Sequence, residues 1–200
     1  KAFFEQEISV PVPPPQMTPE RIRAWESMRF RPHYLPAKDM AKERELKAWK
    51  KQPKFNYVEE SKLPGDYWQL KEGWYLVDER EKPQYQAGDQ MYAPDVFGSV
   101  LEDLRQRGII QNFKHPRSQF NLSPEELENP QVITAFTKAL GLAGIPNIEV
   151  RLERNMERNI IGNMHQPQYG DTNTSEWWGD QYDAGQRRLY GGASLRGGLS

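Results

Sequence analysis

The sequence predicts an α+β fold, an irregular and loop-rich domain with amphipathic helices, preceded by an extended proline-rich arm and short helices. Three observations lead to this prediction. Aromatic residues make up 12% of the chain, so the core is expected to be built largely from rings. Two segments repeat apolar residues at helical spacing. Other segments have the alternating, aromatic composition of strands.

Composition limits the size of the domain and its partners. Two hundred residues suffice for one sizeable domain with an extended arm. Lys plus Arg (27) and Asp plus Glu (28) almost cancel, so no overall field attracts nucleic acid or an anionic membrane. The absence of cysteine excludes disulfides, thiolate nucleophiles and cysteine-bound zinc. No apolar run is long enough to span a membrane, and nothing indicates a cellular location.

Residues 1–63 are expected to form the proline-rich arm and a helical segment. The five prolines between Pro11 and Pro19 favour an extended polyproline conformation, which suits a tether or a contact between the copies of an oligomer. A proline-rich ligand for another protein is the alternative. Thr18 can cap a helix from Pro19 to about Met28. A second helix is expected over Lys38–Lys51.

The globular domain is expected over residues 64–200. The stretch "DYWQLKEGWYLVDE" has strand-type residues on both sides of Gly73. The clearest helix lies in "YAPDVFGSVLEDLRQRG", where Pro94 suits the first turn and Gly108 suits the C-terminal cap. The stretch "IIQNF" that follows is expected to be a strand.

The second half of this region contains further helix signals. Ser123 and Glu126 form a capping-box pattern that predicts a short helix. Asn129 followed by a proline begins a longer amphipathic helix, which Gly141 is expected to end. Residues 148–152 alternate as a strand does, and the residues after them are spaced as in a helix.

Two other functions deserve comparison with simple binding. The order of helix, strand and helix resembles a winged-helix module, but the exposed face of the first helix carries mixed charge, which disfavours contact with phosphates. Trp rings near several carboxylates would suit a glycoside hydrolase. Dense acidic residues in such a loop are more often hydrogen-bonding groups or calcium ligands. The carboxylates in question are Asp171, Glu176, Asp180 and Asp183.

The C-terminal stretch "GNMHQPQYGDTNTSEWWGDQYDAGQRRLYGGAS" carries a resemblance to a known family. It resembles formylglycine-generating-enzyme-like, or sulfatase-modifying-factor, domains in the order Gly-Asn, Glu-Trp, Asp-x-Tyr and an Arg-rich strand that ends in Gly-Gly-Ser. The matching positions are Gly162 with Asn163, Glu176 with Trp177, Asp180 with Tyr182, and the stretch "RRLYGGAS". The resemblance covers about forty residues and implies the C-type lectin fold.

The sequence departs from this family in two ways. Family members that oxidise a substrate cysteine need cysteines of their own, so the absence of cysteine excludes that activity. The family's domain also continues beyond such a Gly-Gly-Ser strand, so we expect the domain to be incomplete at Ser200. Proteins diversified by retroelements use the same fold to display a variable surface, and "GGASLRGGLS" is similar to the start of such a region.

The leading prediction is a non-enzymatic display or binding protein that recognises a protein or a glycan through an aromatic, glycine-rich surface near its C-terminus. Adjacent Trp177 and Trp178 should face opposite ways in an extended segment, with one in the core and Trp178 nearer the surface. No cofactor is expected unless calcium binds the acidic loop. The candidate ligand-binding residues are Trp178, Tyr182, Tyr190 and Arg196, and the candidate calcium ligands are Asp171, Asp180 and Asp183.

Overall fold

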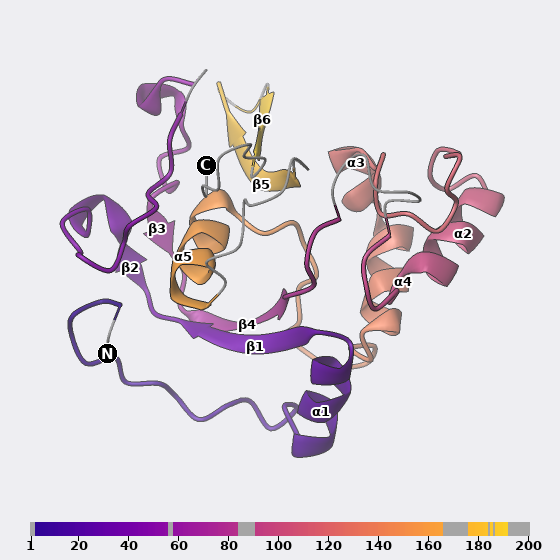
Figure 1. Ribbon diagram of the computed structural model, residues 1–200, viewed down its shortest axis with the longest axis horizontal. Helices are drawn as coiled ribbons and strands as arrows, with labels where there is room; N and C mark the ends of the chain where they lie inside the picture. Colours follow the sequence, from indigo (N-terminus) through magenta and orange to yellow (C-terminus); the bar gives the residue numbers. More distant parts are fainter. Residues whose placement is uncertain are drawn as a thin grey trace. The chain divides into compact units, whose positions relative to one another are not determined.

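The computed structural model describes residues 3–55, 58–83, 91–165, 176–183, 185 and 187–191. These residues form a mixed α+β, loop-rich structure in which helices accompany small two-stranded sheets (Figure 1). The coarse fold class is therefore confirmed. Among these residues, no helix has the length and apolar character needed to cross a membrane.

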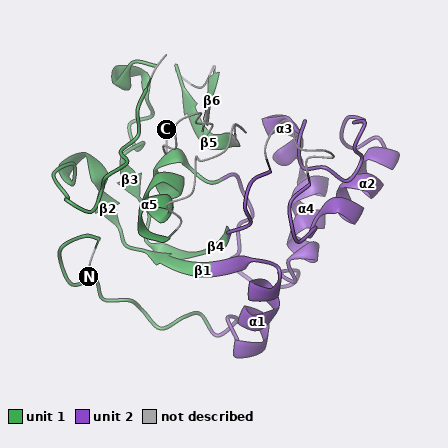
Figure 2. Cartoon of the chain, in the orientation of Figure 1, with its two compact units in different colours: residues 1–14, 32–77, 153–200 green, residues 15–31, 78–152 purple. Residues whose placement is uncertain are grey.

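The chain divides into two compact units that alternate along the sequence (Figure 2). Unit 1 contains residues 1–14, 32–77 and 153–200, and unit 2 contains residues 15–31 and 78–152. The expected boundary between residues 63 and 64 falls inside the second segment of unit 1. A compact unit is not necessarily an independent domain, so that boundary stays a prediction.

Unit 1 combines small sheets with one central helix. The sheets pair β1 with β4, β2 with β3, and β5 with β6, and the last two pairs are antiparallel. The bounds are β1 Phe30–Leu35, β2 Lys38–Asp39, β3 Gln69–Leu70, β4 Gly73–Asp78, β5 Glu176–Tyr182 and β6 Arg187–Gly191, with α5 at Asn155–His165 and 3-10 turns η1 Met40–Lys42 and η2 Glu60–Lys62.

Helix α5 is the centre of the unit 1 core, and it contacts β3 and β5 (Figure 1). Every residue from Asn155 to Gly162 is buried, although many of them are polar. The apolar residues of the helix pack into a cluster drawn from all three segments of the unit. This cluster includes Leu35, Met40, Trp49, Tyr67, Leu70, Val77, Met156, Ile160, Ile161, Trp178 and Leu189.

Unit 2 contains the helices whose caps the sequence predicts. Thr18 caps α1, Ser123 forms a capping box with Glu126, and Asn129 caps α4. Gly108 and Gly141 follow α2 and α4 with positive φ angles of 67° and 66°, as expected for C-terminal glycines. These predictions are confirmed. The bounds are α1 Pro19–Ser27, α2 Gly98–Gln106, α3 Pro124–Leu127 and α4 Pro130–Ala139.

Aromatic contacts and one buried cation hold unit 2 together. The rings of Phe97 and Phe136 stack at 4.4 Å as α2 packs against α4. Trp25 of α1 donates its indole N–H to the carbonyl of Leu140 at 2.8 Å. The buried guanidinium of Arg105 donates to carbonyl oxygens of the loop that follows α2, which fixes the path of that loop. Its acceptors are the carbonyls of Gln111, Pro116, Ser118 and Phe120.

Four local predictions are wrong. Lys38–Lys51 forms strand β2, a 3-10 turn and further turns in place of a helix. Helix α2 begins at Gly98, so Pro94 lies before the helix and not in its first turn, where the sequence predicts it. Residues 109–113 and 148–152 form no strand, because no described strand pairs with either of them.

Candidate functional site

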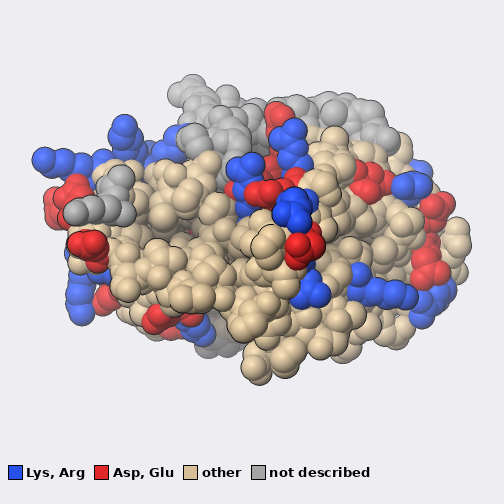
Figure 3. Space-filling model, turned by 90° about the horizontal axis from the view of Figure 1, so that it is seen from below, with Lys and Arg blue, Asp and Glu red and all other residues tan. Residues whose placement is uncertain are grey.

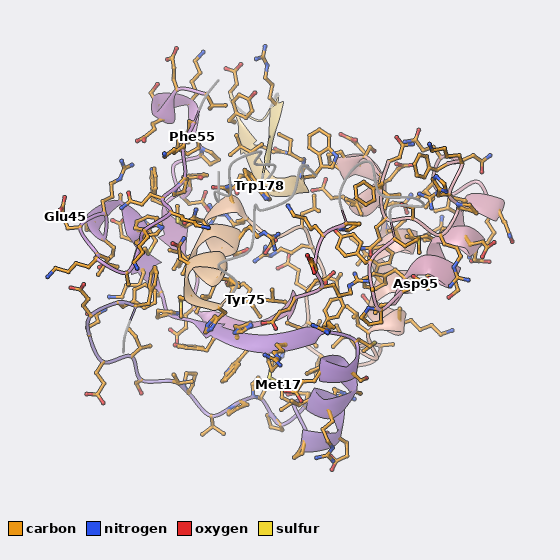
Figure 4. All side chains as sticks on the ribbon, in the orientation of Figure 1. Met17, Glu45, Phe55, Tyr75, Asp95 and Trp178 are labelled. Atoms are coloured by element: carbon orange, nitrogen blue, oxygen red, sulfur yellow. The ribbon has the colours of Figure 1, made fainter. Side chains whose placement is uncertain are left out.

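The hairpin β5–β6 places the tryptophan pair on opposite faces. Trp178 is 5% exposed and belongs to the unit 1 core, whereas Trp177 is 39% exposed. Figure 4 shows Trp178 beside α5. The prediction that one of the two rings fills the core is confirmed, but the prediction that Trp178 is the surface ring is wrong. Alternation along a strand separates two faces without indicating which face is covered, and here α5 covers the face of Trp178.

Asp180 lies under this hairpin, at the start of α5. One carboxylate oxygen accepts a hydrogen bond from Arg154 Nε at 3.1 Å, and the other accepts from the backbone N–H of Asn155 at 2.6 Å. The Asp180 side chain is 1% exposed and that of Arg154 is 13% exposed. The carboxylate therefore satisfies one of the free N–H groups at the helix N-terminus and neutralises a nearly buried guanidinium.

Arg154 also contacts the turn before β3 and the first residue of that strand. Its guanidinium donates to the carbonyls of Asp66 at 2.7 Å and Gln69 at 3.2 Å. A third contact joins Nη2 to the Asp66 carboxylate at 3.4 Å. One side chain thus links the start of α5, strand β5 and the turn that leads to β3. This arrangement fixes the hairpin against the rest of unit 1.

Burial determines the protonation behaviour of this cluster. Desolvation raises the pKa of Asp180 above its ordinary value, although the Asn155 N–H and the Arg154 charge act in the opposite direction. Burial also raises the pKa of the Tyr67 hydroxyl, and the Asp180 charge adds to that effect. Tyr67 therefore stays protonated at neutral pH, and its hydroxyl donates a hydrogen bond to Asn155 Oδ1.

Three asparagines four residues apart extend the polar network along one side of α5. Asn155 accepts from Tyr67, and Asn159 Oδ1 accepts from the indole N–H of Trp49 at 2.7 Å. Asn163 binds both backbone groups of Lys51, accepting its N–H and donating to its carbonyl, each at 3.0 Å. The sequence analysis missed this role, although the four-residue spacing in "RNMERNIIGNM" was a visible signal.

A polar pocket opens beside the cluster and the hairpin. Its volume is about 460 Å³, which lies within the range of ordinary small-molecule sites. Arg154 and Asp180 form its inner wall, while the amide of Gln181 and the carboxylate of Asp66 are more exposed. The complete lining is Lys62, Leu63, Pro64, Asp66, Arg154, Gly179, Asp180, Gln181, Tyr182 and Gly185.

The structure brings two of the predicted site residues to this pocket, namely Tyr182 and Asp180. Asp183 lies in the turn after β5 with a φ of 55°, and its N–H donates to the carbonyl of Lys62 at 3.1 Å. Tyr190 pairs with Trp177 in the backbone register of the hairpin. The side chain of Tyr190 and all of Asp171 and Arg196 lie outside the part of the chain that is described.

The predicted calcium site therefore stays a prediction, because one of its three ligands is not described. Among the described residues, no cluster of three or more histidine or acidic side chains could hold a metal ion. Asp180 already has a cationic partner in Arg154 and a backbone partner in Asn155. The two carboxylate oxygens of Asp180 thus face protein donors.

Comparison with known proteins yields no match: no family model, no curated protein and no solved structure is significantly similar to this chain. The candidate site must therefore be judged on its own chemistry.

Proposed function

We propose that this protein is a non-enzymatic binding protein of C-type-lectin-like fold, and that it holds a glycan in the polar pocket beside hairpin β5–β6. The pocket itself supports this proposal most directly. Its volume of about 460 Å³ has room for a small saccharide. Its lining combines an ammonium, a carboxylate, an amide and a phenol ring, which belong to Lys62, Asp66, Gln181 and Tyr182.

The side chains of the pocket suit the chemistry of a sugar. A saccharide presents hydroxyl groups that both donate and accept, together with apolar C–H faces. Gln181 can donate and accept, Asp66 can accept, and Lys62 can donate. The ring of Tyr182 supplies apolar surface next to these polar groups. The mixture of charges fits a neutral ligand better than an anion.

The burial and hydrogen bonds of Asp180 favour a binding protein over a glycoside hydrolase. A glycoside hydrolase needs two carboxyl groups that reach the scissile bond. Both oxygens of Asp180 accept hydrogen bonds from protein groups, and its side chain is 1% exposed. The predicted partner, Glu176, has no described side chain. We therefore assign Asp180 a positioning role, in which it holds Arg154 and the hairpin beneath the ligand.

A second property of the surface disfavours nucleic acid as the ligand. On the face drawn in Figure 3, basic and acidic side chains are interspersed. The formal net charge of −1 agrees with this distribution. Binding to a phosphate backbone depends on clustered positive charge, so a neutral ligand is the better match.

An array of immobilised neutral and acidic oligosaccharides tests the proposal with the full chain as the probe. We expect binding to at least one neutral glycan, and we expect Gln181→Ala and Tyr182→Ala each to weaken it about tenfold, as loss of one to two polar or stacking contacts would. Gln106→Ala, an exposed glutamine of α2, is the matched control and should bind normally.

The same array is read in calcium and in chelator. Since Arg154 already neutralises Asp180, we expect the same affinity in both conditions. Absence of binding to every glycan, or equal binding by the pocket variants and the control, would refute the proposed site. Binding that requires calcium would instead favour the predicted acidic site.

A further inference from the structure

The proline-rich stretch from Val10 to Pro14, in unit 1, is an exposed apolar segment with no assigned role. Val10 is 58% exposed and Val12 is 90% exposed, which makes them two of the large apolar side chains that the described residues leave open to solvent. Residues 7–14 form no helix, strand or turn, and Figure 1 shows an extended trace before α1. Exposed apolar side chains concentrated in one short segment commonly mark a contact surface.

The sequence of this stretch favours a polyproline II helix, which has three residues per turn. Prolines at 11, 13 and 14 hold φ near the value of that helix, and the structure has no turn between Val10 and Pro14. Residues three apart therefore share an edge, so Val10 lies above Pro13 and Pro11 above Pro14, while Val12 occupies the third edge. All three edges are apolar.

One of these edges faces the chain's own surface. Val10 lines an apolar pocket of about 410 Å³ in unit 1, together with Phe3, Phe4 and Ile8. The edge of Pro11 and Pro14 and the edge of Val12 are left for a partner. Polyproline-binding grooves contact two edges of their ligand in this way, so the stretch presents the kind of face that such a groove needs.

The N-terminal end of the stretch is fixed to unit 1. Phe3 and Phe4 are buried in the unit 1 core, where their rings meet edge to face at 5.0 Å. A segment that is anchored at this end and stiffened by its own prolines loses little conformational entropy when it binds.

We infer that Val10–Pro14 is the binding site for a polyproline-recognising domain whose groove is lined by Trp and Tyr side chains and bordered by basic residues. The prolines have no N–H groups, so this segment has few donors with which to add a strand to a partner's sheet. Their carbonyls are acceptors, which Trp N–H and Tyr O–H groups can satisfy. The inference is independent of the glycan proposal.

The charges next to the stretch determine which grooves it fits. Glu5 and Glu7 precede it, and no Lys or Arg lies between them and Val10. At the other end, Arg21 donates to the carbonyl of Gln16 at 2.8 Å and Glu20 pairs with Arg23 at 3.2 Å, so the acidic flank is the N-terminal one. An acidic groove, which selects ligands with a flanking Arg or Lys, would repel these carboxylates. A basic border would attract them.

The test uses the full chain and three isolated probe domains, namely a WW domain and an EVH1 domain with basic grooves and an SH3 domain with an acidic groove. We expect micromolar binding to a basic-groove probe, measured by calorimetry, and at least tenfold weaker binding to the SH3 domain. Pro11→Ala with Pro14→Ala should weaken the basic-groove complex about tenfold or more, and Val12→Ser should weaken it without altering a proline.

Pro146→Ala is the matched control, because it removes an exposed proline from a turn of unit 2 and should leave binding unchanged. Thermal melts check that each variant keeps the fold of the parent chain. The inference is overturned if no probe binds at millimolar concentration, or if the Pro11 and Pro14 changes leave binding intact. Sedimentation that shows dimers dispersed by the same changes would also overturn it, because it would assign the stretch to a second copy of the chain.

Discussion

Replacing Asp180 with alanine should destabilise unit 1 strongly. The change removes the acceptor of two hydrogen bonds, from Arg154 Nε at 3.1 Å and from the Asn155 N–H at 2.6 Å. Loss of one partner from a buried ion pair costs about 3–5 kcal/mol, because the remaining charge stays buried. Arg154 keeps a second carboxylate, that of Asp66, at 3.4 Å, which partly compensates its charge although the Asp66 side chain is 56% exposed. Because of this remaining partner, we expect a loss of about 3 kcal/mol in the free energy of unfolding, at the lower end of the range.

Urea unfolding of a double-mutant cycle measures this effect. The cycle compares Asp180→Ala, Arg154→Ala and the double variant with the parent chain. Since the two side chains contact each other, the double variant should lose less than the sum of the single losses, by about 1–3 kcal/mol. A loss below about 1 kcal/mol for Asp180→Ala, or strict additivity, would contradict the buried-pair description.

The remaining predictions concern pH, one hydrogen bond and one glycine. Burial raises the pKa of Asp180 in the folded state, so above about pH 4 the native state binds more protons than the unfolded state. The free energy of unfolding, compared with that of Asp180→Asn, should therefore fall as pH rises from about 4 through the folded pKa. Urea unfolding at several pH values would contradict this if the difference between the two proteins stayed flat or rose. Asn159→Ala leaves the buried Trp49 N–H without its acceptor and should cost about 1–3 kcal/mol; an unchanged urea midpoint would rule out that bond. A Cβ on Gly98 would lie 2.2 Å from the carboxylate of Asp95, which would have to move away from its donors, the Gly98 N–H at 2.7 Å and Arg117 at 2.6 Å. Gly98→Ala should therefore cost about 1–3 kcal/mol and lower the melting temperature, whereas Gly65→Ala, with no atom within 4 Å, should not; equal melting temperatures would contradict this.

Apart from the start of α2, local rules predicted these helix ends correctly because the signals act within one turn. The Thr18 and Asn129 caps and the Ser123 capping box each depend on a side chain two or three residues from the N–H that it binds. Gly141 ends α4 for the same local reason, since its φ of 66° suits glycine. Such interactions need no knowledge of the rest of the fold.

The wrong predictions fall where distant contacts decide the structure. The expected helix at Lys38–Lys51 is replaced by turns, and Trp49 and Lys51 at its end bind Asn159 and Asn163, more than a hundred residues away. The stretch "IIQNF" pairs with no strand; instead the backbone N–H of Gln111 donates to Glu126 Oε1 at 2.6 Å, fifteen residues further along the chain. Propensity cannot anticipate either partner.

The candidate site was predictable only in part. The resemblance at the C-terminus directed attention to Asp180 and Tyr182, which line the pocket. The role of Arg154 was not visible, because the residues that it joins are far apart in sequence and no local pattern relates them. The spacing of the three asparagines was visible, but polar residues in a helix are usually assigned to its solvent face.

The chain path of unit 1 has a consequence for how the protein is made. Residues 78–152, which supply most of unit 2, leave the ribosome before α5 and hairpin β5–β6 exist. Every residue of unit 2 is therefore available before unit 1 is complete. The first two segments of unit 1 must wait for residues 153–200, with Tyr67 and Trp49 still lacking Asn155 and Asn159. During that interval the rings of unit 1 are open to other chains, which makes this the period in which a chaperone would be of most use.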